Sequence, residues 1–310
     1  MYKYVIKRLL LLIPVMLGVS FIIFSIMNLT PGDPASLLLG EDQNEQAIER
    51  LREELGLNEP FLVRYVKYVG DALRGDFGIS YRSKEPVFDV IFARFPYTLR
   101  LAAMAILISA LFGVLIGILT AVKQYSAIDN AVLGGTLIVT SMPNFWLGMM
   151  LIILFTVKLG ILPATGAESW YSYIMPGLAA SGSYMANIIR MTRSSMLEVL
   201  RQDYVRTAKA KGANRKTVVY KHALRNALLP IVTLIGMNIG WQLGGTIVVE
   251  QVFAIPGIGT LMLTSIRSKD IPVVTAGVVF VCLLAGVINL ATDIVYAYID
   301  PRVKSQYVKE

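Results

Sequence analysis

The sequence predicts an all-α polytopic membrane protein with six transmembrane helices and a small helical extracytoplasmic segment between the first and the second. Hydrophobic residues make up 55% of its 310 residues, and the mean hydropathy of +0.61 is too high for an ordinary soluble domain. Six apolar stretches are long enough to cross a bilayer. On the topology given below, the predicted cytoplasmic side holds 17 Lys and Arg against 6 Asp and Glu, and the outer side holds 12 against 15. This asymmetry is typical of inner-membrane topology, and it makes a nucleic-acid partner the weaker explanation of the net charge of +8.

The first predicted span is Leu9–Leu29, which follows three basic residues. At about 1.5 Å per residue it is roughly 31 Å long, which matches a hydrocarbon core of about 30 Å. A cleaved signal peptide would have a shorter apolar region and a small-residue cleavage site, and no such site precedes Pro31. We therefore assign residues 1–29 to the N-terminus and the first transmembrane helix, with the amino end inside.

Residues 30–96 form the only sizeable polar segment and are predicted to be an extracytoplasmic helical cap. Helical patterns cover Asn44–Leu55, Pro60–Arg74 and Pro86–Phe95; the first two end at a glycine. Three short helices in so few residues leave little core of their own. The basic residues of this segment do not contradict an outside location, because loops longer than about 60 residues translocate largely regardless of charge.

Residues 97–310 are predicted to form a five-helix core. Pro143 is expected to kink or divide the second of these spans. The third is rich in Gly, Ala and Ser, which suits close helix packing. Six spans in total place both termini in the cytoplasm. The five predicted core spans are Leu99–Val122, Ala131–Val157, Ile174–Met196, Ala227–Val249 and Ile271–Tyr296.

The most basic stretch lies in a cytoplasmic loop at about residues 197–226. Between Arg190 and Arg225 there are ten Lys and Arg but only two acids. Such charges either fix topology or form a docking surface, and their number alone does not decide between the two. Their order is more informative: Asp203–Lys211 is predicted to be a short helix that Gly212 ends, and a second helical pattern leads to the next span. We interpret the loop as a rigid lever with an exposed tip.

This loop resembles the cytoplasmic coupling loop of ABC importer permeases. Of the general loop pattern, anchored at Gly212, only Ala208 and Leu224 match, and Leu229–Pro230 comes five residues late. The version present here resembles the variant of the peptide and nickel branch, which includes the B-type dipeptide and oligopeptide permeases. The resemblance spans nearly the whole chain and rests on Tyr204–Gly212, His222–Asn226, Pro31–Pro34, Gly75–Gly78, Val249–Phe253 and Pro256–Gly259.

The resemblance implies a membrane-spanning permease subunit of an ATP-driven importer for di- or oligopeptides, which forms half of the translocation path. Glutathione and nickel chelates stay open as alternative substrates. The implied partners are a second homologous permease subunit, two ABC ATPase subunits, an extracytoplasmic solute-binding protein and the lipid bilayer of a bacterial or archaeal cytoplasmic membrane. The residues implied to couple to the ATPase are Tyr204, Arg206, Thr207, Ala208, Lys209, Ala210, Lys211, Gly212 and Ala213.

Several kinds of chemistry are not expected in this chain. The nearest approach to a nucleotide-binding loop, Gly212–Thr217, lacks the glycine before its lysine, so ATP hydrolysis is expected in partner subunits and the chain is not expected to be an enzyme. One cysteine, Cys282, and one histidine, His222, allow neither a disulfide framework nor a metal site, and no cofactor is expected. An intramembrane hydrolase is a remote alternative, since no paired carboxylates face this histidine.

An ion-coupled secondary carrier is a second remote alternative. Such carriers place ionisable side chains in the middle of the membrane. Here Arg100 and Asp293 are expected near helix ends, and Glu250 is expected to begin an outer loop. A passive path that is driven from outside the chain fits this distribution better.

Polar and adaptable residues within the predicted spans are candidates for the substrate path. Hydrogen bonding between helices explains the polar members equally well. Glycines at Gly240, Gly244 and Gly245 suit either packing or a hinge, and the sequence does not separate the two. The path candidates are Ser141, Asn144, Met237, Asn238, Trp241 and Gln242.

Overall fold

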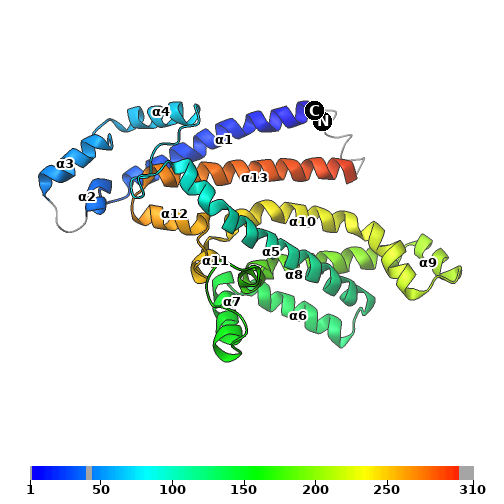
Figure 1. The fold of residues 1–310 in the computed structure, drawn as a ribbon. Helices are drawn as coiled ribbons and strands as arrows, with labels where there is room; N and C mark the ends of the chain where they lie inside the picture. The colour runs from blue at the N-terminus through cyan, green and yellow to red at the C-terminus, as the bar shows by residue number, and fades with distance from the viewer. Residues whose placement is uncertain (1, 40–43, 300–310) are drawn as a thin grey trace. The chain divides into compact units, whose positions relative to one another are not determined.

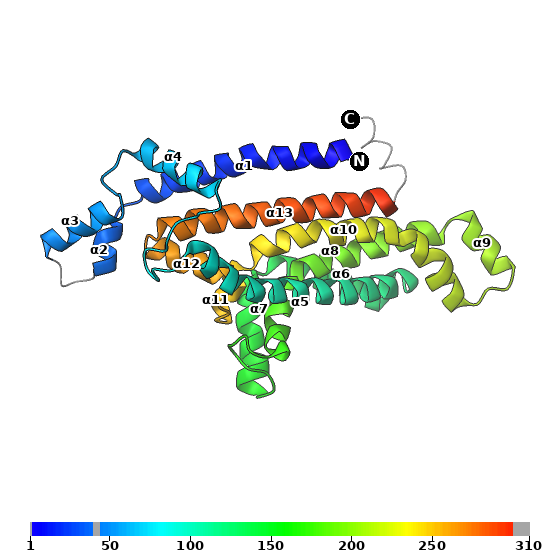
Figure 2. The ribbon, with the colours of Figure 1, turned by 45° about the horizontal axis from the view of Figure 1, so that its top comes forward.

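The computed structural model of the chain describes residues 2–39 and 44–299, and within these ranges it is helical with no strand (Figures 1 and 2). The only bridge between extended residues in the described part joins Ile79 and Pro86. This confirms the predicted all-α class. The chain divides into two units, each described separately below: Tyr2–Thr98 with Pro256–Val287, and Leu99–Ile255 with the chain from Ile288.

The first unit contains the cap. Its helices are α1 (Tyr2–Leu29), α2 (Pro34–Leu39), α3 (Glu45–Glu54), α4 (Phe61–Ala72), the first part of α5 (Val87–Val122), α12 (Ile258–Arg267) and the first part of α13 (Ile271–Ile299). Its core is a cluster of buried apolar side chains: Phe24, Met27, Val87, Ile91, Ile258, Met262, Ile271, Val273, Val274 and Ala276.

Aromatic packing holds α4 against α1. The Tyr65 ring lies 5.1 Å from the ring of Phe21, edge to face, and 5.6 Å from the ring of Phe24. The Tyr65 hydroxyl donates to the carbonyl of Leu17 at 2.9 Å and lies 3.0 Å from the Ser20 hydroxyl. The helix predicted at Pro60–Arg74 is therefore present as α4, which packs along α1.

The second unit contains the rest of the core. Its helices are α5 from Leu99, α6 (Ala127–Ser141), α7 (Asn144–Leu151) with the π-helical continuation η1 (Ile152–Lys158), η2 (Trp170–Tyr173), α8 (Ile174–Leu200), α9 (Asp203–Ala210), the π-helical η3 (Thr217–Leu224), α10 (Arg225–Gly245) and α11 (Ile247–Val252). The central helix is α8, which packs against α6, α7 and α10. One buried cluster lies between α5, α8, η3 and α10: Ile118, Ala121, Ile188, Met196, Val219, Ala223, Ala227 and Ile231.

Two glycines of α5 allow it to lie close to α8, although close packing had been predicted from the small residues of the α8 span. A Cβ placed on Gly117 would lie 2.5 Å from Thr192 Cβ and 2.9 Å from the carbonyl oxygen of Ile189. A Cβ on Gly113 would lie 2.7 Å from Ile188. Only glycine therefore fits at this crossing.

Two predicted boundaries were wrong. The expected short helix Pro86–Phe95 and the span from Leu99 form one continuous helix of 36 residues, α5, with Pro96 inside it. Proline removes one backbone hydrogen bond but its fixed φ is compatible with a helix. The rings of Phe92 and Phe95 pack on Phe280 at 5.5 and 5.3 Å, on the turn that leads to this proline.

The predicted division at Pro143 is confirmed. Met142 is extended, with φ −87 and ψ 131, as expected for a residue that precedes proline. The pair α6 and α7–η1 is bent by 108° at this point, and α7 points away from the direction of α6 in Figure 2.

Four helical stretches within the described residues are long and apolar enough to cross a membrane, and five are if the bent pair is one span. The fourth predicted span, α8, is 27 residues long but is not among them, because it carries Arg190 and Arg193 among many small residues. Most of its N-terminal half is buried, so it does not need an apolar surface. A membrane protein with several spans is confirmed, and the count of six stays a prediction.

Candidate functional site

The short helix predicted at Asp203–Lys211 is present as α9, which begins at Asp203 and ends at Ala210. Val205 is fully buried and anchors the helix. The Tyr204 hydroxyl accepts a hydrogen bond from Asn226 Nδ2 at 2.8 Å, which links α9 to the first turn of α10. Figures 1 and 2 show α9 beyond the ends of α8 and α10. The helix is thus tied down on one side and presents its other side outward.

Gly212 ends α9 as the sequence predicted. Its φ of +84° lies in the left-handed region, where a side chain is strained. Its N–H donates to Lys209 O at 3.0 Å, and the next N–H, of Ala213, donates to Ala208 O at 3.1 Å. This pair of bonds is the Schellman arrangement of a helix C-terminus. The turn out of α9 is therefore fixed by backbone bonds that need this glycine.

The coupling residues predicted from the sequence form one exposed surface, with two members half-buried. Ala208 and Ala213 are half-buried, whereas Tyr204, Arg206, Thr207, Lys209, Ala210, Lys211 and Gly212 are exposed. A cavity of about 380 Å³ lies beside them; its lining includes Lys209, Ala213 and Arg215 together with Val122 at the end of α5. Arg215 Nη2 donates to the carbonyl of Val122 at 3.3 Å. This surface is basic, accessible and attached to three membrane helices.

The substrate-path candidates fall on two separate stretches of the second unit. Ser141 and Asn144 flank the break between α6 and α7; the Ser141 hydroxyl donates to Leu137 O within its own helix at 2.9 Å, and Asn144 is half-buried. The other four lie on α10. Both α7 and α10 pack on α8, which thus lies beside both stretches.

The four candidates on α10 have different environments. Met237 is 55% exposed, whereas Gln242 is buried and its Nε2 lies 3.4 Å from the carbonyl of Ala180 on α8. Asn238 Nδ2 is buried and has no hydrogen-bond partner in the described part of the chain. The side chain of Trp241 lies outside what the structure describes. Gln242 therefore contacts α8, and a role for these residues in a substrate path stays a prediction.

Gly240 is a packing position rather than an open hinge. A Cβ at this residue would lie 2.6 Å from Asn289 Oδ1 on α13. Gly244, one turn later, has nothing within 4 Å of the same position. The two glycines therefore differ, a distinction that the sequence did not make.

Sequence reasoning missed an ion pair between α6 and α8. Asp129 has no exposed side-chain surface, and its two carboxylate oxygens accept from Arg193 Nε and Nη2, both at 2.7 Å. The backbone N–H of Tyr125 donates to the same carboxylate at 2.8 Å. The expectation that ionisable groups avoid these helices is thus incomplete. Glu250, expected to begin an outer loop, is also buried, in the first turn of α11.

Sequence reasoning also missed the role of Lys269 and Asp270, which precede α13. Both are buried. The Lys269 ammonium donates to the carbonyls of Thr30 and Gly32, in the Pro31–Pro34 motif. The Asp270 carboxylate accepts from the Ser80 hydroxyl and from the backbone N–H groups of Tyr81 and Arg82. The polar motifs of the cap were visible in the sequence, but their partners were not. Asp270 lies 190 residues after Ser80, and Lys269 lies 239 residues after Thr30.

The carboxylate of Asp33, the residue before α2, binds the first turn of that helix and a nearby arginine. Asp33 Oδ2 accepts from the backbone N–H and the hydroxyl of Ser36, at 3.0 and 2.8 Å, and from Arg52 Nε at 3.3 Å. Burial raises the pKa of the Asp33 carboxyl, but the hydrogen bonds from Ser36 and the charge of Arg52 outweigh burial and hold this pKa below its usual value. Asp33 therefore caps α2 in its charged form.

Comparison with known proteins decides the family. The family described as "Binding-protein-dependent transport system inner membrane component" matches residues 113–305, and the N-terminal part of such membrane components matches residues 1–102. The chain belongs to this family. It is a permease component of a transport system, and the family resemblance found in the sequence is confirmed.

Two relatives are similar over nearly their full length. The chain is 42% identical to the dipeptide transport system permease protein DppB of Alkalihalophilus pseudofirmus over 332 residues, which cover 98% of this chain and 100% of that protein. It is 45% identical to the glutathione transport system permease protein GsiC of Salmonella paratyphi A over 306 residues, with 98% and 99% covered.

A solved structure shares the fold. The inward-facing MetNI methionine ABC transporter matches with a TM-score of 0.52 at 21% identity, over 66% of this chain and 94% of that chain. The family description itself names a transport system that depends on a binding protein. Relatives of this kind are permease subunits and are not themselves enzymes.

Proposed function

We propose that this permease carries di- or oligopeptides as one of two homologous membrane subunits of an ATP-driven importer, with half of the translocation path formed by each. The relative named as a dipeptide permease supports this substrate class. Glutathione, itself a tripeptide, is an alternative substrate, because one of the relatives is named as a glutathione permease. A nickel chelate is a further alternative substrate. A secreted solute-binding protein would deliver the substrate to the outer side, over the cap of residues 30–96.

We further propose that two ABC ATPase subunits grip residues 204–213. The observation that carries this proposal is the form of α9: a basic helix, exposed on one side, fixed by buried Val205 and closed by the left-handed turn at Gly212. Movement of the ATPases would displace α9 and bias the permease between outward- and inward-facing states. Such a lever shifts the equilibrium only by the difference between its interactions in the two states.

The membrane in question is the cytoplasmic membrane of a bacterium or archaeon, with both termini and α9 inside. The excess of Lys and Arg around α9 supports this orientation. Met237 and Asn238 on α10 are the path candidates that we retain, with Ser141 and Asn144 beside the break before α7.

The coupling proposal is tested in proteoliposomes that contain the complete importer. Charge reversal of Lys209 and Lys211 to Glu, or Gly212→Val, is expected to lower peptide uptake at least tenfold while ATPase activity persists, because the grip on α9 is lost. Lys221→Glu is the matched control, because this lysine is exposed in η3 and lies outside the proposed contact. Peptide uptake by the importer with this substitution should stay within about twofold of wild type.

Normal uptake by the Lys209/Lys211 charge-reversal variant and by Gly212→Val would refute the lever. The substrate class is tested in the same vesicles with labelled dialanine and labelled glutathione at equal concentration. Faster uptake of dialanine supports the peptide proposal, and uptake of glutathione alone would replace it with the alternative.

A further inference from the structure

Helix α4 packs on α1 through one face. Its Phe61 ring lies 5.9 Å from the ring of Phe21 and 5.5 Å from that of Phe24, and the ring of Tyr68 stacks on Phe24 at 6.1 Å. Together with the Tyr65 contacts described above, these rings hold α4 along α1, and Figures 1 and 2 show the two helices side by side. The rest of the circumference of α4 is available to other partners.

A second face of α4 is apolar and exposed. Its members recur at spacings of four, three and four residues, so they form one row along the helix. Three of them are among the most exposed apolar side chains of the first unit: Leu73, the C-cap residue, is 80% exposed, Val66 67% and Leu62 63%. The fourth is half-buried. We call this row the α4 stripe; it consists of Leu62, Val66, Val69 and Leu73.

Charged residues lie on a third side of α4. At about 100° per residue, Lys67 and Asp71 are centred roughly 150° around the helix from the α4 stripe. Lys67 pairs with Glu59, and Asp71 lies 3.9 Å from Arg74 in the turn after the helix. These charges therefore have partners within the chain. The surface of α4 that does not pack on α1 is divided between an uncharged apolar side and a charged side.

The exposed apolar surface of α1 continues onto the α4 stripe. α1 is long and apolar enough to cross a membrane, and little of it is buried within the chain. A groove of about 140 Å³ between the two helices is lined by Ile13 and Leu17 of α1, both exposed, and by Val69 and Leu73 of the stripe. The stripe and the exposed side of α1 are thus parts of one surface.

The groove suits hydrocarbon. None of the described residues that line it is charged, and the only hydroxyls among them are those of Ser20 and Tyr68. The Ser20 hydroxyl donates to the carbonyl of Leu17 at 3.0 Å, and the Tyr68 hydroxyl is buried. A charged occupant would lose its hydration in this groove without compensation, whereas the methylenes of an acyl chain would lose none.

We propose that the α4 stripe contacts the acyl chains of the lipid bilayer beside α1. On the topology predicted above, this is the outer leaflet. Leu62, Val66 and Leu73 then lie among acyl chains, and Lys67 and Asp71 lie towards headgroups and water. A helix with one apolar and one charged side is the kind that lies in the membrane interface, and removal of its apolar side from water stabilises it there. Part of the segment predicted to be a cap is therefore bound to the membrane.

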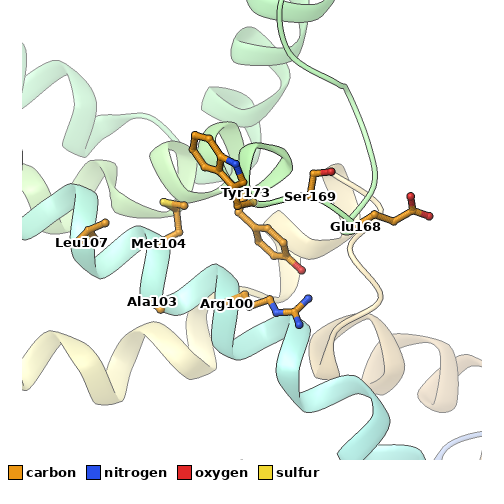
Figure 3. A pocket seen from close by; sticks show the side chains of 8 residues that line it. Arg100, Ala103, Met104, Leu107, Glu168, Ser169 and Tyr173 are labelled. Carbon is orange, nitrogen blue, oxygen red and sulfur yellow. The ribbon is translucent and has the colours of Figure 1, made fainter.

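A cavity in the second unit has the opposite character. It has a volume of about 530 Å³ and lies between α5 and residues 168–173; its lining includes Arg100 of α5 and Glu168 of the segment before α8 (Figure 3). An acyl chain in that cavity would bring hydrocarbon against charged groups. The α4 stripe contains no charged residue, so the same objection does not apply to it.

A protein partner fits the stripe less well than lipid does. The residues that dominate binding between proteins are most often Trp, Tyr and Arg, and Leu and Val are under-represented among them. The α4 stripe consists of Leu and Val alone. A flexible acyl chain needs neither hydrogen bonds nor a matched shape, and aliphatic side chains satisfy it.

The first test uses the complete importer in nanodiscs that contain a phospholipid with a photoreactive diazirine in one acyl chain. Mass spectrometry of the illuminated permease should find the lipid on the α4 stripe and not on Lys67 or Asp71. Labelling of α4 should lie within about threefold of that of α1 and at least roughly tenfold above that of α3, because only the first two contact acyl chains. The transport activity is not needed for this measurement.

The second test is the reactivity of introduced cysteines towards a maleimide that does not enter membranes. Cys282→Ala removes the native thiol. In this background Val66→Cys and Leu73→Cys should react at least roughly tenfold more slowly than Lys67→Cys, because the reagent stays in water. Lys67→Cys is the matched control on the charged side of the same helix. Each variant is accepted only if the complex assembles and hydrolyses ATP.

Only acyl label on the stripe together with slow maleimide reaction supports the lipid contact. Fast reaction at residues 66 and 73 would show that the stripe faces water, and it would overturn the proposal. Slow reaction without acyl label would show that a protein, such as a second permease subunit, covers the stripe, and this result would overturn the proposal as well. Neither test measures uptake, so a failure of the proposed peptide import would leave both results unchanged.

Discussion

The ion pair between Asp129 and Arg193 gives the sharpest prediction about stability. Asp129→Asn keeps the size of the side chain and removes its charge. The substitution leaves the Arg193 guanidinium, whose side chain is 19% exposed, without the carboxylate that receives two of its N–H groups at 2.7 Å. It also weakens the acceptor for the backbone N–H of Tyr125, which ends the turn between α5 and α6.

The loss of unfolding free energy that we expect for Asp129→Asn lies between two known limits. Exposed pairs contribute about 0–1 kcal/mol, and removal of one partner from a fully buried pair costs about 3–5 kcal/mol. Asp129 itself is fully covered, but it lies in the first turn of α6, near the end of the helix, where water is close. We therefore expect a loss of about 2–3 kcal/mol. At about 2–4 °C per kcal/mol for a unit of this size, the midpoint of thermal unfolding should fall by roughly 4–12 °C.

The assay is the loss of the helical circular-dichroism signal on heating in detergent. Arg206→Gln is the control, because Arg206 and Asp203 form an exposed pair at 3.8 Å whose loss should lower the midpoint by less than about 3 °C. The double variant Asp129→Asn with Arg193→Gln should recover at least half of the loss, since the unpaired charge is gone. A shift for Asp129→Asn no larger than that of the control would refute the reasoning.

Two further predictions concern packing and pH. Gly117→Ala should lower the free energy of unfolding by about 1–3 kcal/mol, because its Cβ would meet Thr192 and the backbone of Ile189. Gly134→Ala is the control: a Cβ there has nothing within 4 Å, so this variant should be neutral or stabilising. Thermal unfolding compares the two variants. Because the folded-state pKa of Asp33 is lowered, its carboxylate adds stability above about pH 4 that is lost as the pH falls through the folded pKa. Asp33→Asn should therefore be less stable than wild type at neutral pH, and this difference should shrink as the pH falls through the folded-state pKa, as measured by unfolding at each pH.

Local signals made the membrane helices and α9 predictable. Apolar length alone located α1 and α13, and the proline at residue 143 marked the break after α6. Asp203 and Gly212 bound α9 because an acid favours the first turn and a glycine adopts the left-handed turn at the end. Similarly, Asn44 was predicted at the start of a helix, and its side chain accepts from Gln46 N at 3.1 Å at the start of α3.

Long-range pairings were not predictable, because no local pattern encodes the partner. Asp129 and Arg193 lie 64 residues apart, and Ser80 and Asp270 lie 190 residues apart. Each of these residues taken alone fits an ordinary helix end or loop. The cavity beside Arg100 was hidden for the same reason: its two walls come from different parts of the chain, and each wall by itself carries a single charge.

The ties around α9 indicate how a displacement would spread if the proposed coupling is correct. α9 is joined to α8 through the chain and to α10 through the hydrogen bond of Tyr204 with Asn226. Buried Ile188 and Met196 of α8 pack with Ala227 and Ile231 of α10, and α6 is joined to α8 by the ion pair. All three helices are thus held by contacts that are each costly to break, so a push on α9 moves them together. The extended backbone before Pro143 carries no helical hydrogen bond from α6 into α7. Because α7 packs on α8 as α6 does, we expect α7 to move with α8, and any change of angle between α6 and α7 to occur at this break, between the path candidates Ser141 and Asn144.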